Sequence, residues 1–73
     1  MQRDQATVLD IVRAGQLVQS FVDGLSLQEF RTDLKTQSAV LHRLLIIGEA
    51  VKRLSVDFRD ENPNVPWKLI AGM

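Results

Sequence analysis

The chain has 73 residues, 45% of them hydrophobic, and its nine basic residues balance nine acidic ones. The absence of cysteine excludes disulfides and thiolate metal sites, and a single histidine argues against a transition-metal centre within one chain. Zero net charge argues against a dedicated duplex-DNA binder, and no apolar run approaches the ~20 residues of a membrane span, so we expect a cytoplasmic protein without metal or cofactor.

The first predicted helix runs from about Arg3 to Asp23. Its apolar residues recur at spacings of three and four, which is typical of a helix with one buried face. Gly15 lies on this face, where glycine costs roughly 0.5–1 kcal/mol relative to alanine, and a close crossing with another helix is one reason to tolerate it. Gly24 is the expected C-terminal cap. The apolar residues of the face are Val8, Ile11, Val12, Val18, Phe21 and Val22.

A short second helix is predicted from Leu27 to about Asp33. Ser26 and Glu29 have the spacing of a capping box, in which each side chain binds a backbone amide of the other residue. For the join to the third helix, a kink is an alternative to a loop.

The third predicted helix, from Thr36 to Phe58, is the longest. Its apolar residues cover most of its circumference, which indicates a central helix buried on more than one side. A loop rich in proline and asparagine follows, and a last helix is expected with Pro66 at its first position. The apolar residues of the third helix are Val40, Leu41, Leu44, Leu45, Ile47, Val51 and Leu54.

Three side chains are candidates for chemistry. His42 could act as a general acid or base, but we favour a half-buried histidine with a structural hydrogen bond. Glu49 stands in an apolar run and needs a partner, for which the structural ion pair with Arg53 is favoured over a group across an interface. Trp67 could stack on a nucleobase, although an anchor in the core is the preferred interpretation. Residue chemistry alone therefore predicts no active site in these 73 residues.

The predicted fold class is all-α, an antiparallel helical bundle formed by a single domain over residues 1–73. A core this small buries only roughly 60% of the unfolded surface, which favours oligomerisation as a source of stability. The predicted elements also leave the third helix poorly covered. Either a later part of the chain or a second copy must pack on it.

Four sequence motifs together resemble the HepT-like proteins of the HEPN superfamily. They are DIVRAG at residues 10–15, FRTD at 30–33, AV-x-x-x-L-x-I-I-G-E-A at 39–50 and PW-x-x-I-A-G-M at 66–73. The resemblance covers the whole chain but only about the first two-thirds of the family's domain. The domain is therefore expected to be incomplete at its C-terminus.

The resemblance implies an endoribonuclease that needs no metal ion, the toxin of a type VII-like toxin–antitoxin module. It also implies a homodimer in which two copies of the motif R-x4-H-x-Y face each other across a cleft for RNA. In the family's pattern that motif follows the PW-x-x-I-x-G-M run, so no catalytic residue is assigned here and the motif is expected after Met73. The expected partner is a small nucleotidyltransferase antitoxin, which modifies the motif's tyrosine with AMP. Glu49 is then expected to face the cleft or to support a motif residue.

An alternative from another functional class is a non-catalytic helical module that dimerises or binds a partner. Continuation of the encoded chain with R-x4-H-x-Y would distinguish the ribonuclease from this module. A DNA-binding three-helix domain is the weakest interpretation, because no basic recognition helix is visible.

Overall fold

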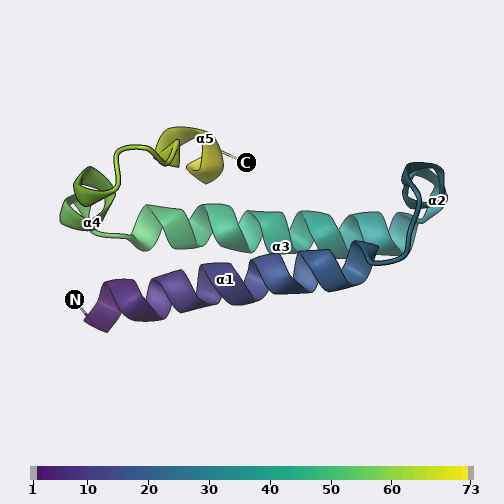
Figure 1. Ribbon diagram of the computed structural model, residues 1–73, viewed down its shortest axis with the longest axis horizontal. Helices are drawn as coiled ribbons and strands as arrows, with labels where there is room; N and C mark the ends of the chain where they lie inside the picture. Colours follow the sequence, from purple (N-terminus) through teal and green to yellow (C-terminus); the bar gives the residue numbers. More distant parts are fainter. Residues whose placement is uncertain (1, 73) are drawn as a thin grey trace.

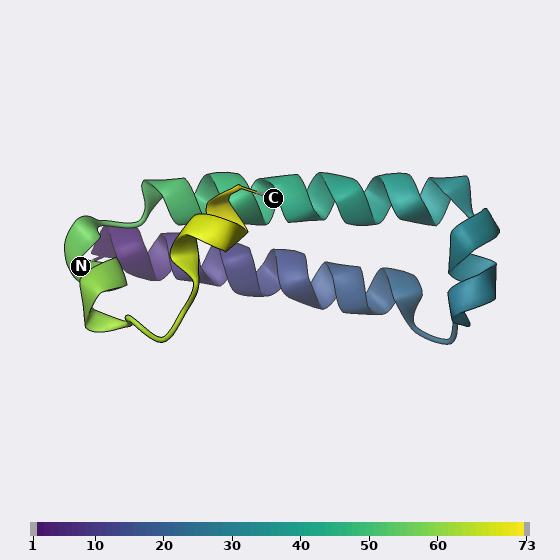
Figure 2. The same ribbon diagram turned by 90° about the horizontal axis from the view of Figure 1, so that it is seen from above.

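The computed structural model describes residues 2–72 as five helices. The two long helices lie side by side and antiparallel, with one short helix at each end and the last helix folded back along the third (Figures 1 and 2). Every regular element in this part of the chain is helical, which confirms the predicted all-α bundle. The bounds are α1 Gln2–Val22, α2 Leu27–Thr32, α3 Leu34–Arg53, α4 Val56–Glu61 and α5 Trp67–Ala71.

The core between α1 and α3 is small. The buried apolar side chains of residues 2–72 are Ala14 of α1, Ala50 and Val51 of α3, and Leu54, and none of these four is more than 3% exposed. Side chains as small as these limit the apolar area that folding removes from water. Because few side chains are buried, each of them provides a large share of the total stability.

The molecule is elongated and leaves much apolar surface uncovered. It measures 41 × 21 × 17 Å with a radius of gyration of 13.9 Å, against roughly 11 Å for a compact domain of this length. Its accessible surface is 5550 Å², whereas a compact monomer of this mass would expose roughly 4500 Å². The exposed large apolar side chains are Leu9, Val12, Leu17, Leu27, Leu34, Leu41, Leu45, Val56 and Leu69.

The turn between α1 and α2 follows the local sequence signals. Gly24 has a φ of 78°, so it ends α1 in the left-handed conformation, as predicted. The predicted capping box is also present: the Glu29 amide donates to Ser26 Oγ at 3.1 Å, and the Ser26 amide donates to Glu29 Oε1 at 2.9 Å. The Ser26 amide, and after it the Ser26 hydroxyl, lowers the pKa of Glu29, and the capping box fixes the start of the short helix α2.

A single residue, Asp33, joins α2 to α3, so the join is a kink and α3 begins two residues before the predicted Thr36. The Asp33 carboxylate accepts hydrogen bonds from the Thr36 hydroxyl at 2.6 Å and from the Thr36 amide at 3.0 Å. Both hydrogen bonds favour the ionised carboxylate and lower the pKa of Asp33. The carboxylate therefore caps α3 at the point where the chain changes direction.

The prediction that the third helix continues to Phe58 is wrong. The helix α3 ends at Arg53, and a separate helix α4 begins at Val56. The reason is Ser55, whose amide and hydroxyl donate to the two carboxylate oxygens of Asp4 at 3.0 and 2.7 Å. The same hydroxyl oxygen accepts from the Phe58 amide at 3.1 Å, so Ser55 caps α4 instead of extending α3.

The last helix is short and lies on α3. It begins at Trp67, with Pro66 as the capping residue and not, as predicted, the first helical residue. In Figure 1 it lies on the side of α3 opposite α1. Within residues 2–72, no helix combines the length and the hydropathy needed to cross a bilayer.

The structure has no close helix crossing at Gly15 that would explain this glycine. A Cβ atom built on Gly15 would meet no atom within 4 Å outside its own helix turn, so no neighbouring helix requires a glycine there. A Cβ atom on Gly24 would also be unobstructed, but its φ of 78° strains any other side chain. The two glycines therefore differ in backbone conformation alone.

Replacing these two glycines by alanine should change stability in opposite directions. We expect Gly15→Ala to raise the free energy of unfolding by about 0.5–1 kcal/mol, because alanine favours the helix. Gly24→Ala should lower it by about 1–2 kcal/mol, because the left-handed conformation is costly with a Cβ atom. Urea denaturation followed by circular dichroism measures both. A destabilising Gly15→Ala would show that this face of α1 is covered by another chain or segment.

Candidate functional site

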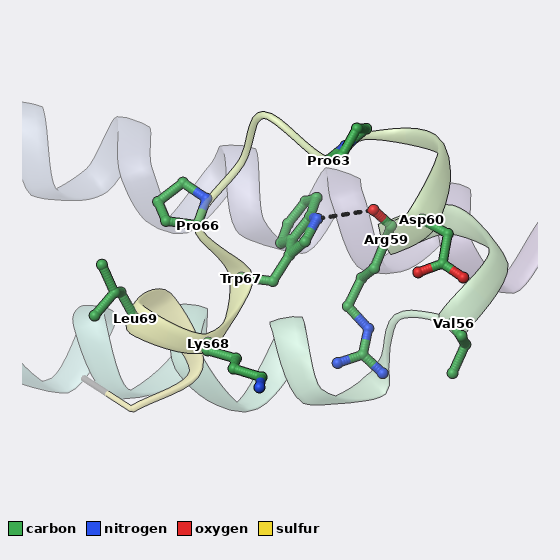
Figure 3. A pocket seen from close by; sticks show the side chains of 8 residues that line it. All are labelled: Val56, Arg59, Asp60, Pro63, Pro66, Trp67, Lys68 and Leu69. Atoms are coloured by element: carbon green, nitrogen blue, oxygen red, sulfur yellow. Dashed lines mark hydrogen bonds between the residues drawn. The ribbon is translucent and has the colours of Figure 1, made fainter.

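An open groove of about 750 Å³ lies between α4 and α5 (Figure 3). The loop at 62–66 folds the chain back, so that residues from both short helices line the same hollow. Its walls combine apolar side chains, one indole ring and three charged groups. The lining residues are Val56, Arg59, Asp60, Pro63, Pro66, Trp67, Lys68 and Leu69.

Trp67 fixes the geometry of the groove. Its indole Nε1 donates to the carbonyl oxygens of Arg59 at 3.2 Å and Asn62 at 3.0 Å, which ties α5 to the end of α4. Its ring also packs against Phe58, with the ring centroids 6.1 Å apart and the planes inclined by 60°. The predicted role as an anchor agrees with these contacts. The ring nevertheless also lines the open groove.

Two cationic side chains enter this groove from different helices. Arg59 of α4 is half-buried, and its Nε atom is buried without a hydrogen-bond partner among residues 2–72. Lys68 of α5 is exposed, and in Figure 3 its amine and the Arg59 guanidinium point toward the same side of the hollow. Asp60 is the one carboxylate in the lining. The groove can therefore bind an anionic group next to a fixed aromatic ring.

A second hollow adjoins the groove and shares Val56 with it. Three basic side chains line it, together with the Asp4 carboxylate. Asp4 is only 4% exposed, and the backbone amide and then the hydroxyl of Ser55 lower the pKa of its carboxyl group. Its negative charge is thus engaged within the fold. The basic residues of this hollow are Arg3, Lys52 and Arg53.

Glu49 is not placed as the sequence predicted. It is exposed, and its carboxylate lies 3.2 Å from Lys52 Nζ instead of pairing with Arg53. Arg53 reaches across to Asp10 of α1, at 3.9 Å. Glu49 lies on the outer face of α3, whereas its neighbours Gly48 and Ala50 are buried. Its expected part in an RNA cleft stays a prediction.

His42 is exposed on α3 and does not line the groove, so the expected half-buried position is wrong. No group of three or more His, Cys, Asp or Glu side chains within residues 2–72 is arranged to hold a metal ion. Sequence reasoning did not single out Arg59 or Lys68. The available signal was the loop with Pro63 and Pro66, which brings the two helices together.

The comparisons with known proteins decide the family. The sequence model described as ribonuclease HepT-like matches residues 11–73 of this chain. The chain belongs to the HepT-like ribonuclease family. This confirms the resemblance that the four sequence motifs indicate. No solved structure matches the chain at a significant level.

Curated relatives are similar over most of this HepT-like chain. A Methanocaldococcus jannaschii protein provisionally named an RNase is 42% identical over 67 residues, which cover 92% of this chain and 55% of the relative. A Thermococcus cleftensis protein provisionally named ribonuclease HepT is 41% identical over 64 residues, covering 88% and 58%. One from Caldanaerobacter subterraneus subsp. tengcongensis, provisionally named an RNase, is 48% identical over 52 residues, covering 71% and 46%. The chain spans about half the length of these relatives.

The motif R-x4-H-x-Y cannot lie within this HepT-like sequence, because the sequence contains no tyrosine. Its predicted position after Met73 is outside the residues that the structure describes. The groove between α4 and α5 is a candidate binding site.

Proposed function

We propose that this protein acts on RNA as an endoribonuclease, the toxin component of a type VII-like toxin–antitoxin module. The observation that carries the proposal is the match of the HepT-like ribonuclease family over residues 11–73. The provisional RNase names of the relatives support the same reaction class. In this proposal the described helices form the scaffold of the enzyme, and the motif R-x4-H-x-Y performs the chemistry in a chain that carries it.

The motif has the groups that RNA cleavage needs without a metal ion. A histidine can take the proton from a 2′-hydroxyl or give one to the leaving oxygen. An arginine can stabilise the charge that develops on the phosphate. We therefore propose that cleavage continues when divalent ions are chelated.

The proposed assembly is a cytoplasmic homodimer that a small nucleotidyltransferase antitoxin neutralises. The exposed surface supports a second copy, because three leucines on one side of α3 remain uncovered. Leu34, Leu41 and Leu45 are 74%, 58% and 48% exposed and are spaced so that they share one helical face. Unpartnered apolar faces of this kind are typical of interaction sites. Sedimentation equilibrium of the purified protein should give twice the mass of one chain, and the mass of a single chain would contradict the dimer.

The test of the reaction is an RNA cleavage assay on the protein produced from its own gene, with its intact mass measured first. We expect a mass above 8.2 kDa and cleavage of single-stranded RNA in EDTA, with the 73-residue chain as the inactive control. The product ends distinguish attack by the 2′-hydroxyl from attack by water. Absence of cleavage by a protein that contains R-x4-H-x-Y would overturn the proposal.

A non-catalytic dimerisation or partner-binding module is the second candidate. One specific observation favours it: these 73 residues have no tyrosine and an exposed histidine away from the groove. A natural product of 8.2 kDa that dimerises without cleaving RNA would establish this alternative.

A further inference from the structure

We propose that the groove between α4 and α5 binds single-stranded RNA. Arg59 and Lys68 would hold a backbone phosphate, and Trp67 would support the adjoining base. The inference rests on the proposed function, since it names a contact surface for that substrate.

The charges that line the two adjoining hollows favour an anion. Five basic side chains line them, but the Lys52 amine lies 3.2 Å from Glu49 and the Arg53 guanidinium lies 3.9 Å from Asp10, so these two charges are already paired. Among residues 2–72, Arg59 and Lys68 have no ion-pair partner within 4.0 Å, although the chain as a whole is neutral. Two cationic side chains without ion-pair partners in one groove can hold a backbone phosphate. The five basic residues are Arg3, Lys52, Arg53, Arg59 and Lys68.

The shape of the groove favours a single strand. Two backbone carbonyls hold the indole of Trp67 in one orientation, and Pro63 and Pro66 stiffen the rim around it. A fixed aromatic ring beside cationic groups is the combination on which single-stranded nucleic acids stack their bases. The bases of a duplex are paired and stacked on each other, so they could not reach this ring.

The experiment measures binding of a fluorescein-labelled 2′-O-methyl oligouridylate to the 73-residue chain by fluorescence anisotropy. The methyl group blocks cleavage through the 2′-hydroxyl, so binding is measured alone. We expect Arg59→Gln combined with Lys68→Gln to weaken binding about tenfold and to reduce the slope of log affinity against log salt by about 0.7, because the contact to one phosphate is lost. A duplex of the same length should bind more weakly than the single strand.

A matched control removes two positive charges from the opposite end of the molecule. Arg31 of α2 and Lys35 of α3 are exposed and lie far from the groove (Figure 1). Arg31→Gln with Lys35→Gln should leave the affinity within about twofold, because it changes net charge equally without touching the site. An equal loss of affinity in both double variants would overturn the proposal that the groove binds RNA. It would show that the positive charges attract RNA without a specific site.

Two single variants separate binding from folding. Lys68→Glu changes an exposed side chain and should weaken binding, whereas Asp60→Asn removes the carboxylate of the groove and should tighten it. Misfolding cannot produce tighter binding.

The outcomes separate this inference from the proposed function. If the groove variants bind RNA as the unchanged chain does, while the natural product cleaves RNA, the groove is not the RNA-binding site and the proposed function stands. If the groove variants no longer bind the antitoxin but still bind RNA, the groove is a protein-binding surface and the inference is overturned. If the unchanged proteins neither bind nor cleave RNA, both proposals fail.

Discussion

Replacing Leu54 by alanine is expected to lower the free energy of unfolding by about 2–5 kcal/mol, because the change removes buried methyl groups and leaves a cavity. Leu54 is 3% exposed and is one of the four buried apolar side chains of residues 2–72. A domain of this length has a total stability of roughly 4–11 kcal/mol. The variant should therefore be largely unfolded at moderate urea concentrations that leave the unchanged chain folded.

The matched control for this change is Leu27→Ala. Leu27 is 67% exposed on α2, so the same substitution removes little buried area and should change stability by less than about 0.5 kcal/mol. Urea denaturation monitored by far-ultraviolet circular dichroism measures both variants. Similar losses at the two positions would mean that the exposed face of α2 is covered by another chain.

Replacing Asp4 by asparagine should also destabilise the fold. The Asp4 carboxylate accepts two hydrogen bonds from Ser55, so it joins the start of α1 to the junction of α3 and α4. In asparagine an NH2 group, which does not accept, replaces one of the two oxygens, so one of the two hydrogen bonds is lost. We expect the thermal midpoint to fall by several degrees, roughly the 4–8 °C that loss of one helix cap produces in a domain of this size.

The Asp4→Asn variant should also reduce the dependence of stability on pH. The hydrogen bonds from Ser55 lower the pKa of Asp4 below its usual 3.8, so the unfolded chain takes up a proton more readily than the folded one. The stabilisation is therefore complete above the usual pKa and is lost as the pH falls below it. Glu29 and Asp33 have lowered pKa values too, so the variant should keep part of the acid sensitivity.

Asp10→Asn is the control for this experiment. It removes the same charge from the same helix, but the Asp10 side chain is 54% exposed and its Oδ2 lies 3.9 Å from Arg53 Nη2. An exposed pair at this distance contributes little, so the thermal midpoint should hardly change. Thermal melts between about pH 3 and pH 7 compare the variants. If Asp4→Asn and Asp10→Asn melt alike throughout, the link between Asp4 and Ser55 does not stabilise the fold.

The sequence predicted those parts of the fold that depend on neighbouring residues. The end of α1 at Gly24 and the capping box of Ser26 and Glu29 each involve groups no more than three positions apart. The break between α3 and α4 was missed because its cause is distant. The residues around Ser55 continue the helical pattern. The helix ends there because the Ser55 amide and hydroxyl donate hydrogen bonds to Asp4, which lies 51 positions earlier.

The candidate site was predictable only in part, for a similar reason. Trp67 was recognised as an anchor from its place behind the prolines, but its hydrogen-bond partners on α4 could not be read from a periodic pattern. Arg59 and Lys68 share a groove because the intervening loop folds back. Glu49 was assigned the wrong partner, since Lys52 and Arg53 are both within one helical turn of it.

The position of Trp67 has an optical consequence. The chain has one tryptophan and no tyrosine, so its intrinsic fluorescence above the phenylalanine range comes from the corner where α5 is tied to α4. Far-ultraviolet circular dichroism, in contrast, comes mainly from the long helices α1 and α3. The two signals therefore monitor different parts of the same molecule during unfolding. A corner that opened before the helical pair would change the emission while the ellipticity stayed constant, and coincident transitions would show a single cooperative unit.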